Sequence, residues 1–263
     1  MAEREAKLVI RDARPEAIAD AIAALDHLAG ARLVPAGEVA LRDVYLDTPT
    51  RALSERGDAL RVRVAGGETL LALKGSGREV DPGVLEREEI EAPWSAAALE
   101  RLQTLLAARG IALHEAPSAG EPVAALRAMG LEAVQEGTTT RRLRNVVDEG
   151  GAIIAELAID EVTYHLKAGR LDAGAVRHHE VEIEAKAPDG AAYLPRAVEA
   201  LRARFGASLL PWLHGKLETG LAITRLLAAG EARPLVIGGH LTPDAYPRLA
   251  KILSDEPAPP DAR

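Results

Sequence analysis

The feature that most constrains this fold is a strict alternation of charged and apolar residues, which returns in one segment after another. The segment Leu60–Val64 reads Leu-Arg-Val-Arg-Val, and the segment Glu180–Lys186 alternates glutamates and a lysine with apolar residues. Successive side chains of a β-strand point to opposite faces, so residues i and i+2 share a face. Each such segment therefore predicts a strand with one charged face and one apolar face.

The strand-like segments are joined by turn signals and separated by helical patterns. Strands are predicted at Glu3–Ile10, Val39–Leu46, Ala59–Val64, Thr69–Lys74, Leu85–Ala92, Thr138–Val147, Gly151–Asp160, Thr163–Ala168 and His178–Lys186. Gly66-Gly67, Glu149-Gly150-Gly151 and Ala168-Gly169-Arg170 are typical hairpin turns. Helices are predicted from Pro15 to Gly30 and at Ala96–Arg109, Pro122–Met129, Ala192–Phe205, Lys216–Ala229 and Ala245–Leu253. About eight strands in two groups of four, split by helices near residues 95–130, predict an antiparallel α+β fold.

The charged strand faces have two possible explanations. An antiparallel sheet commonly exposes one face to water, which is the ordinary meaning of such a pattern. Here the pattern recurs in seven segments, mixes acids and bases in nearly equal numbers, and holds few Ser, Thr, Gln or Asn. We therefore favour an eight-stranded antiparallel β-barrel tunnel, with a charged lumen and with helices packed on its apolar outer surface.

A lumen of this composition indicates a particular ligand chemistry. Arginine and lysine side chains attract a multiply charged anion, and guanidinium groups suit phosphate oxygens. Carboxylates in the same lumen would repel that anion unless a hard divalent cation lies between them. The pattern thus predicts a site for a metal ion and a polyphosphate. The motif Glu-x-Glu-x-Lys occurs in each half of the chain, at Glu3–Lys7 and at Glu182–Lys186, which indicates a pseudo-symmetric barrel.

Composition excludes several other kinds of protein. The absence of cysteine excludes disulfides, thiol catalysis and cysteine-zinc sites, and a formal net charge of −8 disfavours general nucleic-acid binding. No apolar run is long enough to span a membrane and no signal peptide is evident, so we expect a soluble cytoplasmic protein. None of the seven histidines has HExxH spacing, and only one of His178 and His179 can face inward.

Several short motifs occur together in a characteristic order. They are Glu3-Arg-Glu5-Ala-Lys7, Tyr45-Leu-Asp47-Thr48-Pro49, Leu60-Arg61-Val-Arg63, Leu73-Lys74-Gly75, Arg87-Glu-Glu89-Ile-Glu91, Arg142-Leu-Arg144, Glu156-Leu-Ala-Ile-Asp160, Glu180-Val-Glu182-Ile-Glu184-Ala-Lys186 and Gly215-Lys216-Leu-Glu-Thr-Gly220. In these motifs the sequence resembles the CYTH family, also called triphosphate tunnel metalloenzymes, over residues 3–222. The resemblance implies an eight-stranded antiparallel tunnel and metal-dependent chemistry on a triphosphate.

The resemblance also implies roles for individual residues. Glu5, Lys7 and Glu182 would be catalytic. Phosphate oxygens would be held by Lys7, Arg61, Arg63, Lys74, Arg87, Arg142, Arg144, Lys186 and Lys216. A bound Mg²⁺ or Mn²⁺ would be held by Glu3, Glu5, Glu89, Glu91, Asp160, Glu182 and Glu184. A one-residue slip would change these sets. It would turn Glu86, Glu88 and Ile90 inward in place of Arg87, Glu89 and Glu91, and the run Arg141-Arg142-Leu143-Arg144 has the same ambiguity.

The predicted organisation is a tunnel domain at residues 1–229 and a proline-containing extension at residues 230–263, whose last eight residues are expected to be loose. The extension would cover a tunnel mouth or mediate a homodimer. The leading functional hypothesis is hydrolysis of the terminal phosphoanhydride of a small-molecule triphosphate, with inorganic triphosphate as the expected substrate. The alternatives are a class IV adenylate cyclase that makes cyclic AMP from ATP, and a module that binds polyphosphate or nucleotide without turnover.

Overall fold

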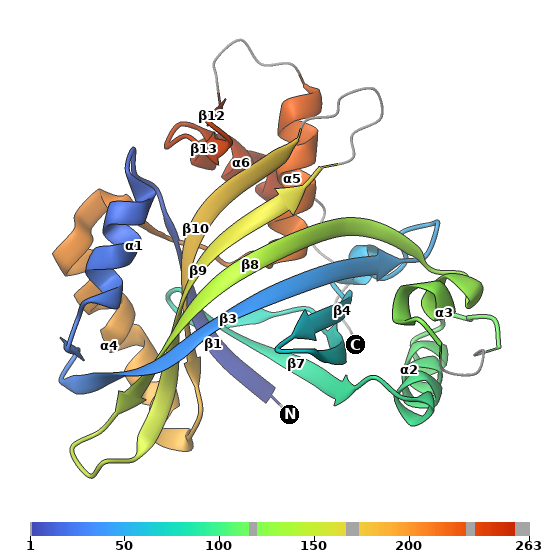
Figure 1. Cartoon of the computed structure of the whole chain (residues 1–263), viewed down its shortest axis with the longest axis horizontal. Helices are drawn as coiled ribbons and strands as arrows, with labels where there is room; N and C mark the ends of the chain where they lie inside the picture. Colours follow the sequence, from blue (N-terminus) through green and yellow to red (C-terminus); the bar gives the residue numbers. More distant parts are fainter. Residues whose placement is uncertain (1, 116–119, 167–173, 230–234, 256–263) are drawn as a thin grey trace.

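In a computed structural model of the chain, eight antiparallel strands close into a ring (Figure 1). The structure describes residues 2–115, 120–166, 174–229 and 235–255. Around the ring the order is β1 (Ala2–Ile10), β7 (Val84–Pro93), β5 (Glu68–Lys74), β4 (Ala59–Ala65), β3 (Ala31–Asp47), β8 (Glu132–Val147), β9 (Ile153–His165) and β10 (Ala175–Ala185). Pairing between β1 and β10 closes the ring. The α+β class and the ring of eight strands confirm the predicted fold.

The grouping of the strands differs from the prediction of two sets of four. Five ring strands precede the central helices and three follow them. The two segments predicted on either side of residue 161 form the single strand β9, because Glu161 and Val162 continue the pairing with β10 without a break. Strand β3 is also longer than predicted. It continues its pairing with β8 on both sides of a bulge between Pro35 and Gly37, two residues that usually end a strand.

Local signals explain most element boundaries. Gly66 and Gly67 have φ angles of +57° and +88° in the turn between β4 and β5, as the hairpin prediction requires. The Ser95 hydroxyl accepts a hydrogen bond from the Ala98 N–H and begins α2 (Ala96–Ala108). Helix α1 (Pro15–Ala23) ends earlier than predicted, because the short strand β2 (His27–Leu28) pairs with β3. The predicted turn at Ala168–Arg170 and the last eight residues lie outside the described residues.

Helices cover the apolar outer face of the ring in two places (Figure 1). Helices α1 and α4 (Pro188–Phe205) pack on β1, β9 and β10, where Leu157, Ile159, Val181 and Ile183 belong to their core. Helices α2 and α3 (Pro122–Ala128) pack on β3, β4 and β5 in a second core. Burying both apolar surfaces leaves the charged residues on the inner face of the strands.

A third core closes one end of the ring. Helices α5 (Lys216–Ala228) and α6 (Ala245–Ser254) pack together there with the short strands β12 (Val236–Ile237) and β13 (His240–Leu241). This core includes Val9, Val162, Tyr164 and Val176, which lie on the inner face of their strands beyond the charged residues. Residues 235–255 of the chain's last part thus cover the inner face at this end.

The remaining elements are short. Strand β6 (Arg78–Asp81) pairs with β7, strand β11 (Leu209–Pro211) pairs with β1, and a single 3₁₀ turn spans Ser54–Arg56. Among the described residues, no helix is long and apolar enough to cross a membrane.

Gly190 tests how closely the outer helices pack on the ring. A Cβ atom at Gly190, in the first turn of α4, would lie 2.0 Å from the Ile154 carbonyl oxygen of β9. Gly→Ala at an ordinary helical position stabilises a protein by about 1 kcal/mol, but this contact is with backbone and forces the helix away. We expect Gly190→Ala to lower the free energy of unfolding by about 1–3 kcal/mol, measured by urea denaturation.

Gly75→Ala is the matched control, because its Cβ would lie 3.8 Å from its nearest neighbours, an ordinary contact distance. We expect its stability to stay close to that of the unmodified chain. A Gly190→Ala variant as stable as the control would contradict the packing described here.

Candidate active site

The inner face of the ring gathers charged side chains of both signs. Its ammonium and guanidinium groups are those of Lys7, Arg61, Arg63, Lys74, Arg87 and Arg141, to which α5 adds Lys216. Its carboxylates are those of Glu3, Glu5, Asp43, Glu89, Glu91, Glu156, Asp160, Glu180, Glu182 and Glu184. Ion pairs within this set divide it into two groups, one on each side of β1.

The two Glu-x-Glu-x-Lys motifs lie side by side. Strands β1 and β10 are antiparallel neighbours, in which Lys7 stands opposite Glu182 and Glu5 stands opposite Glu184. Lys7 Nζ lies 3.0 Å from Glu182 Oε1 and donates a hydrogen bond to the His214 carbonyl oxygen at 3.3 Å. The repeat seen in the sequence therefore brings the motifs from both halves of the chain into direct contact.

The first group is built around three carboxylates, the buried Asp160 and Glu180 and the partly buried Glu182. One oxygen from each lies within 4.8 Å of the others, and Asp160 and Glu180 are fully buried. Lys216 Nζ lies 3.0 Å from Asp160 and 2.9 Å from Glu182, and also contacts Glu180. Arg141 forks onto Asp160 at 2.8 and 2.6 Å and contacts Glu182. Together with Lys7, Lys216 and Arg141 thus place three cations around these carboxylates.

Helix α5 fixes Lys216 in this position. Lys216 is the first residue of the helix, and the Glu218 carboxylate accepts a hydrogen bond from the Gly215 N–H at 2.6 Å. The Trp212 N–H donates to the Lys7 carbonyl oxygen at 2.9 Å, and its indole N–H donates to Thr219 Oγ1 at 2.9 Å. These contacts attach the start of α5 directly to β1.

The second group lies on β1, β4, β5 and β7. Lys74 Nζ bridges Glu3 and Glu89 at 3.0 and 3.1 Å. Arg87 pairs with Glu3 at 3.3 Å and contacts Glu5. In the neighbouring strands Arg61 lies 3.4 Å from Glu91 and 3.7 Å from Glu89, and Arg63 holds Asp43 through two hydrogen bonds of 2.8 Å.

The register on β7 agrees with the prediction. Arg87, Glu89 and Glu91 face inward, whereas Glu86 and Glu88 face outward, where they pair with Arg4 and Arg109. Lys186 follows the end of β10 at the margin of the ring. It is about one third exposed and lies 2.6 Å from Glu184.

The prediction was wrong for Arg142 and Arg144. Both face outward, toward α1: Arg142 pairs with Asp20 at 2.7 Å, and Arg144 donates to the carbonyl oxygens of Ala23 and Leu33. Arg141 takes their place inside. Because Arg141 and Arg142 are consecutive, the alternation fits either register, and only the pairing of Arg141 with Asp160 on β9 selects one.

Sequence reasoning also left other inner residues without a role. Glu180 belongs to the alternating run of β10, and this alternation by itself indicates that its side chain faces inward with those of Glu182 and Glu184. Asp43 gave a weaker signal, since its neighbours on the same face of β3 are Leu41 and Tyr45. His178 faces inward, as one of the two adjacent histidines must, and its ring stacks on Tyr164 at 5.5 Å.

Comparison with known proteins identifies the family. The sequence profile of the CYTH domain matches residues 1–205. The chain belongs to the CYTH family. Lys216 lies beyond the matched range and joins the inner face through α5. A search of curated proteins finds no match.

Solved structures resemble this chain to different degrees. A protein from Hippeastrum, described as an adenylyl cyclase candidate with a dominant triphosphatase activity, is 18% identical with a TM-score of 0.51, over 89% of this chain and 98% of its own. An adenylate cyclase candidate from Bacillus halodurans is 19% identical with a TM-score of 0.45, over 81% and 94%. The Mimivirus capping enzyme triphosphatase is 10% identical with a TM-score of 0.39, over 76% and 90%.

Burial and neighbouring charges shift the pKa values of Glu180 and Glu182, the two glutamates of the first group, in opposite directions. Burial would raise the pKa of Glu182, but Lys216, Lys7 and Arg141 outweigh it and hold that pKa well below its ordinary value. For Glu180 burial prevails over Lys216 and Lys7, and with Glu182 and Asp160 close by its pKa is raised. Glu182 is therefore fully ionised at neutral pH, whereas Glu180 carries its charge less easily.

The cations in this group respond in the opposite way. Burial would lower the pKa values of Lys7 and Lys216, but Glu180 and Glu182 outweigh it and raise both. His178 lies 3.7 Å from Glu180, yet burial and the nearby Lys216 hold its pKa well below the ordinary value, so the imidazole is neutral. The lysines therefore keep their charge for an anion.

The carboxylate group fits a divalent cation. Asp160, Glu180 and Glu182 offer oxygen ligands within 4.8 Å of one another, and hard cations such as Mg²⁺ and Mn²⁺ bind such oxygens. Both Glu180 oxygens are buried and accept no hydrogen bond from the described residues, although the Lys216 ammonium lies against one of them. A cation would provide the ligand contact that these oxygens lack.

Glu180 and Glu182 should have opposite effects on stability. Because the pKa of Glu180 is raised on folding, its ionisation destabilises the native state at pH 7, and Glu180→Gln should raise the thermal unfolding midpoint in chelator. This gain should vanish as the pH falls toward about 4.3, where the carboxyl is protonated in the unfolded chain as well.

Glu182→Gln is the matched variant, because the pKa of Glu182 is lowered on folding. The ionised Glu182 carboxylate stabilises the folded protein when the pH is above the pKa of Glu182 in the unfolded chain. That contribution is lost as the pH falls through the lower pKa that Glu182 has in the folded protein. We expect a lower midpoint at pH 7. The unfolding midpoints are measured by circular dichroism. If both variants shifted the midpoint equally and in the same direction, the opposite pKa shifts of Glu180 and Glu182 would be refuted.

Proposed function

We propose that this CYTH protein is a metal-dependent hydrolase that cleaves the terminal phosphoanhydride bond of a triphosphate, with inorganic triphosphate as its preferred substrate. One observation carries the proposal. Lys7, Lys216 and Arg141 converge on the carboxylates of Asp160, Glu180 and Glu182 inside a closed ring. Cations and carboxylates concentrated in this way match a polyphosphate that binds together with a divalent cation.

The basic side chains would exchange carboxylate partners for phosphate oxygens. Arg61, Arg63, Lys74 and Arg87 form one side of the inner face, and Lys7, Arg141 and Lys216 form the other. A chain of phosphates between them would meet charge along its whole length, and Lys186 would meet it at the margin. Fixed cations also offset the negative charge that spreads over the transferred phosphoryl group in the transition state.

Asp160, Glu180 and Glu182 would hold Mg²⁺ or Mn²⁺. Bound there, the ion would neutralise phosphate oxygens and polarise the phosphoryl group toward attack by water. Lys7 would position the phosphoryl group beside Glu182, since the two stand opposite each other on β1 and β10. Glu5 would orient the attacking water, with its carboxylate held by Arg87. Glu3, Glu89, Glu91 and Glu184 would complete the ligand and water shell.

The fold comparison supports this choice of chemistry. The Hippeastrum protein shares the fold across most of both chains and is described as having a dominant triphosphatase activity despite its assignment as a cyclase candidate. A cyclase acting on ATP would also require a site for adenine. Cyclisation of ATP is therefore one outcome that the experiment below distinguishes.

The first experiment measures phosphate release from inorganic triphosphate and from ATP, with Mg²⁺, with Mn²⁺ and with chelator. We expect metal-dependent release that favours the inorganic compound. Cyclic AMP formed from ATP, detected by mass spectrometry, would replace the proposal with a cyclase. Tight triphosphate binding without turnover in either metal would replace it with a binding module.

The two neighbouring arginines provide an internal comparison. Arg141 faces the carboxylate group and Arg142 faces Asp20 on the outer surface. Removing one preorganised donor to a transition-state oxyanion lowers turnover by about 10²–10³-fold. We expect Arg141→Ala to lose kcat/KM for triphosphate on the order of 10²-fold, whereas Arg142→Ala retains nearly full activity.

Unfolding midpoints of both variants show whether a loss of activity merely follows from a loss of structure. A stable Arg142→Ala variant that loses as much activity as Arg141→Ala would show that the register described here is wrong.

A further inference from the structure

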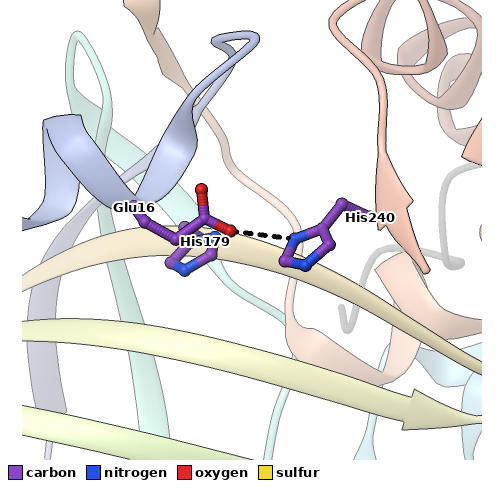
Figure 2. A group of neighbouring side chains, drawn as sticks. All are labelled: Glu16, His179 and His240. Atoms are coloured by element: carbon purple, nitrogen blue, oxygen red, sulfur yellow. Dashed lines mark ion pairs between the residues drawn. The ribbon is translucent and has the colours of Figure 1, made fainter. Parts of the chain in front are cut away.

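Three side chains capable of binding a metal meet on the outside of the ring, away from the inner carboxylates. Glu16 comes from the first turn of α1, His179 from β10 and His240 from β13 (Figure 2). One ligand atom of each lies within 4.8 Å of the other two. Glu16 and His240 are joined by a contact of 3.4 Å between Oε1 and Nδ1.

The backbone holds the two histidines beside each other. Strand β13 pairs with β10 through Arg177 and His240, and the Arg177 N–H donates to the Gly239 carbonyl oxygen at 2.7 Å. The Arg177 guanidinium also donates to the Gly238 carbonyl oxygen at 3.3 Å. As a result the imidazole rings of His179 and His240 lie nearly parallel, with centroids 6.1 Å apart.

His179 is buried without the partners that a buried imidazole normally has. It is only 3% exposed, and its Nδ1 accepts or donates no hydrogen bond among the described residues. Its Nε2 lies 3.4 Å from the Glu161 carboxylate. A carboxylate that accepts the Nε2–H fixes the tautomer in which Nδ1 carries a free lone pair, an arrangement common for histidines that bind metals.

Simple ion pairing does not account for this cluster. The carboxylate of Glu161 lies beside His179 Nε2, and the carboxylate of Glu16 lies beside His240 Nδ1. These two pairings leave His179 Nδ1 without a hydrogen-bond partner among the described residues. A bound cation would satisfy both histidines and the carboxylate at once.

We propose that Glu16, His179 and His240 form a second metal site, for Zn²⁺ or a similar late first-row divalent ion. Two imidazoles and one carboxylate suit such ions, whereas Mg²⁺ strongly prefers oxygen ligands. Glu161 acts as the carboxylate that orients His179. The site joins α1 and β10 to β13 and so attaches the segment at residues 235–255 to the ring. It does not depend on the proposed hydrolase activity.

The test titrates the metal-free full chain with Zn²⁺ by calorimetry, in millimolar Mg²⁺ to occupy the inner carboxylates. Glu16→Gln and His240→Gln each remove one ligand, and Glu16 is exposed enough that its substitution should leave the fold intact. His27→Gln, at an exposed position on β2, is the control. We expect one equivalent of tightly bound Zn²⁺ in the unmodified chain and in the control, and affinity at least about 10-fold weaker in both ligand variants.

A second readout is the thermal unfolding midpoint. Zn²⁺ should raise it in the unmodified chain and the control, but not in Glu16→Gln, because a ligand that binds only the folded state stabilises it. The proposal would be overturned if both ligand variants bound Zn²⁺ like the control, or if millimolar Mg²⁺ abolished Zn²⁺ binding to the unmodified chain.

Discussion

The structure depends on compensating opposite charges inside a closed ring of strands. Desolvation makes a buried charge unfavourable unless a partner lies close by. Here Lys7, Lys216 and Arg141 meet Asp160, Glu180 and Glu182, and the same arrangement recurs around Lys74 and Arg87. The compensation is incomplete at Glu180, whose pKa burial raises. That imbalance is what a bound divalent cation would relieve, and it links the stability of the ring to the chemistry of the site.

The charged interior requires an apolar exterior and a closed end. Helices α1, α2, α3 and α4 bury the outer faces of the strands, so that the alternating pattern satisfies both surfaces at once. Helix α5 has two roles, because it packs against Tyr164 through Gly220 and also places Lys216 among the carboxylates. Helix α6 packs against α5, and β13 belongs to the same apolar core.

The two proposed metal sites differ in the chemistry of their ligands. The inner group offers carboxylate oxygens to a hard cation, beside the lysine and arginine side chains that are proposed to bind phosphate. The outer cluster offers two imidazoles and a carboxylate, and it lies where β13 meets the ring. The adjacent residues His178 and His179 belong to opposite faces of β10, so a single strand supplies both environments.

Local alternation of residues was enough to predict most strands, their charged face and most residues of the inner site, because it is a property of neighbouring residues. It could not choose between Arg141 and Arg142, since both registers keep the alternation, and the choice rests on pairing with β9. It could not place Glu161 within a continuous β9, nor bring His240 beside Glu16 and His179. Those features depend on contacts between residues far apart in the chain, which form only when the chain folds.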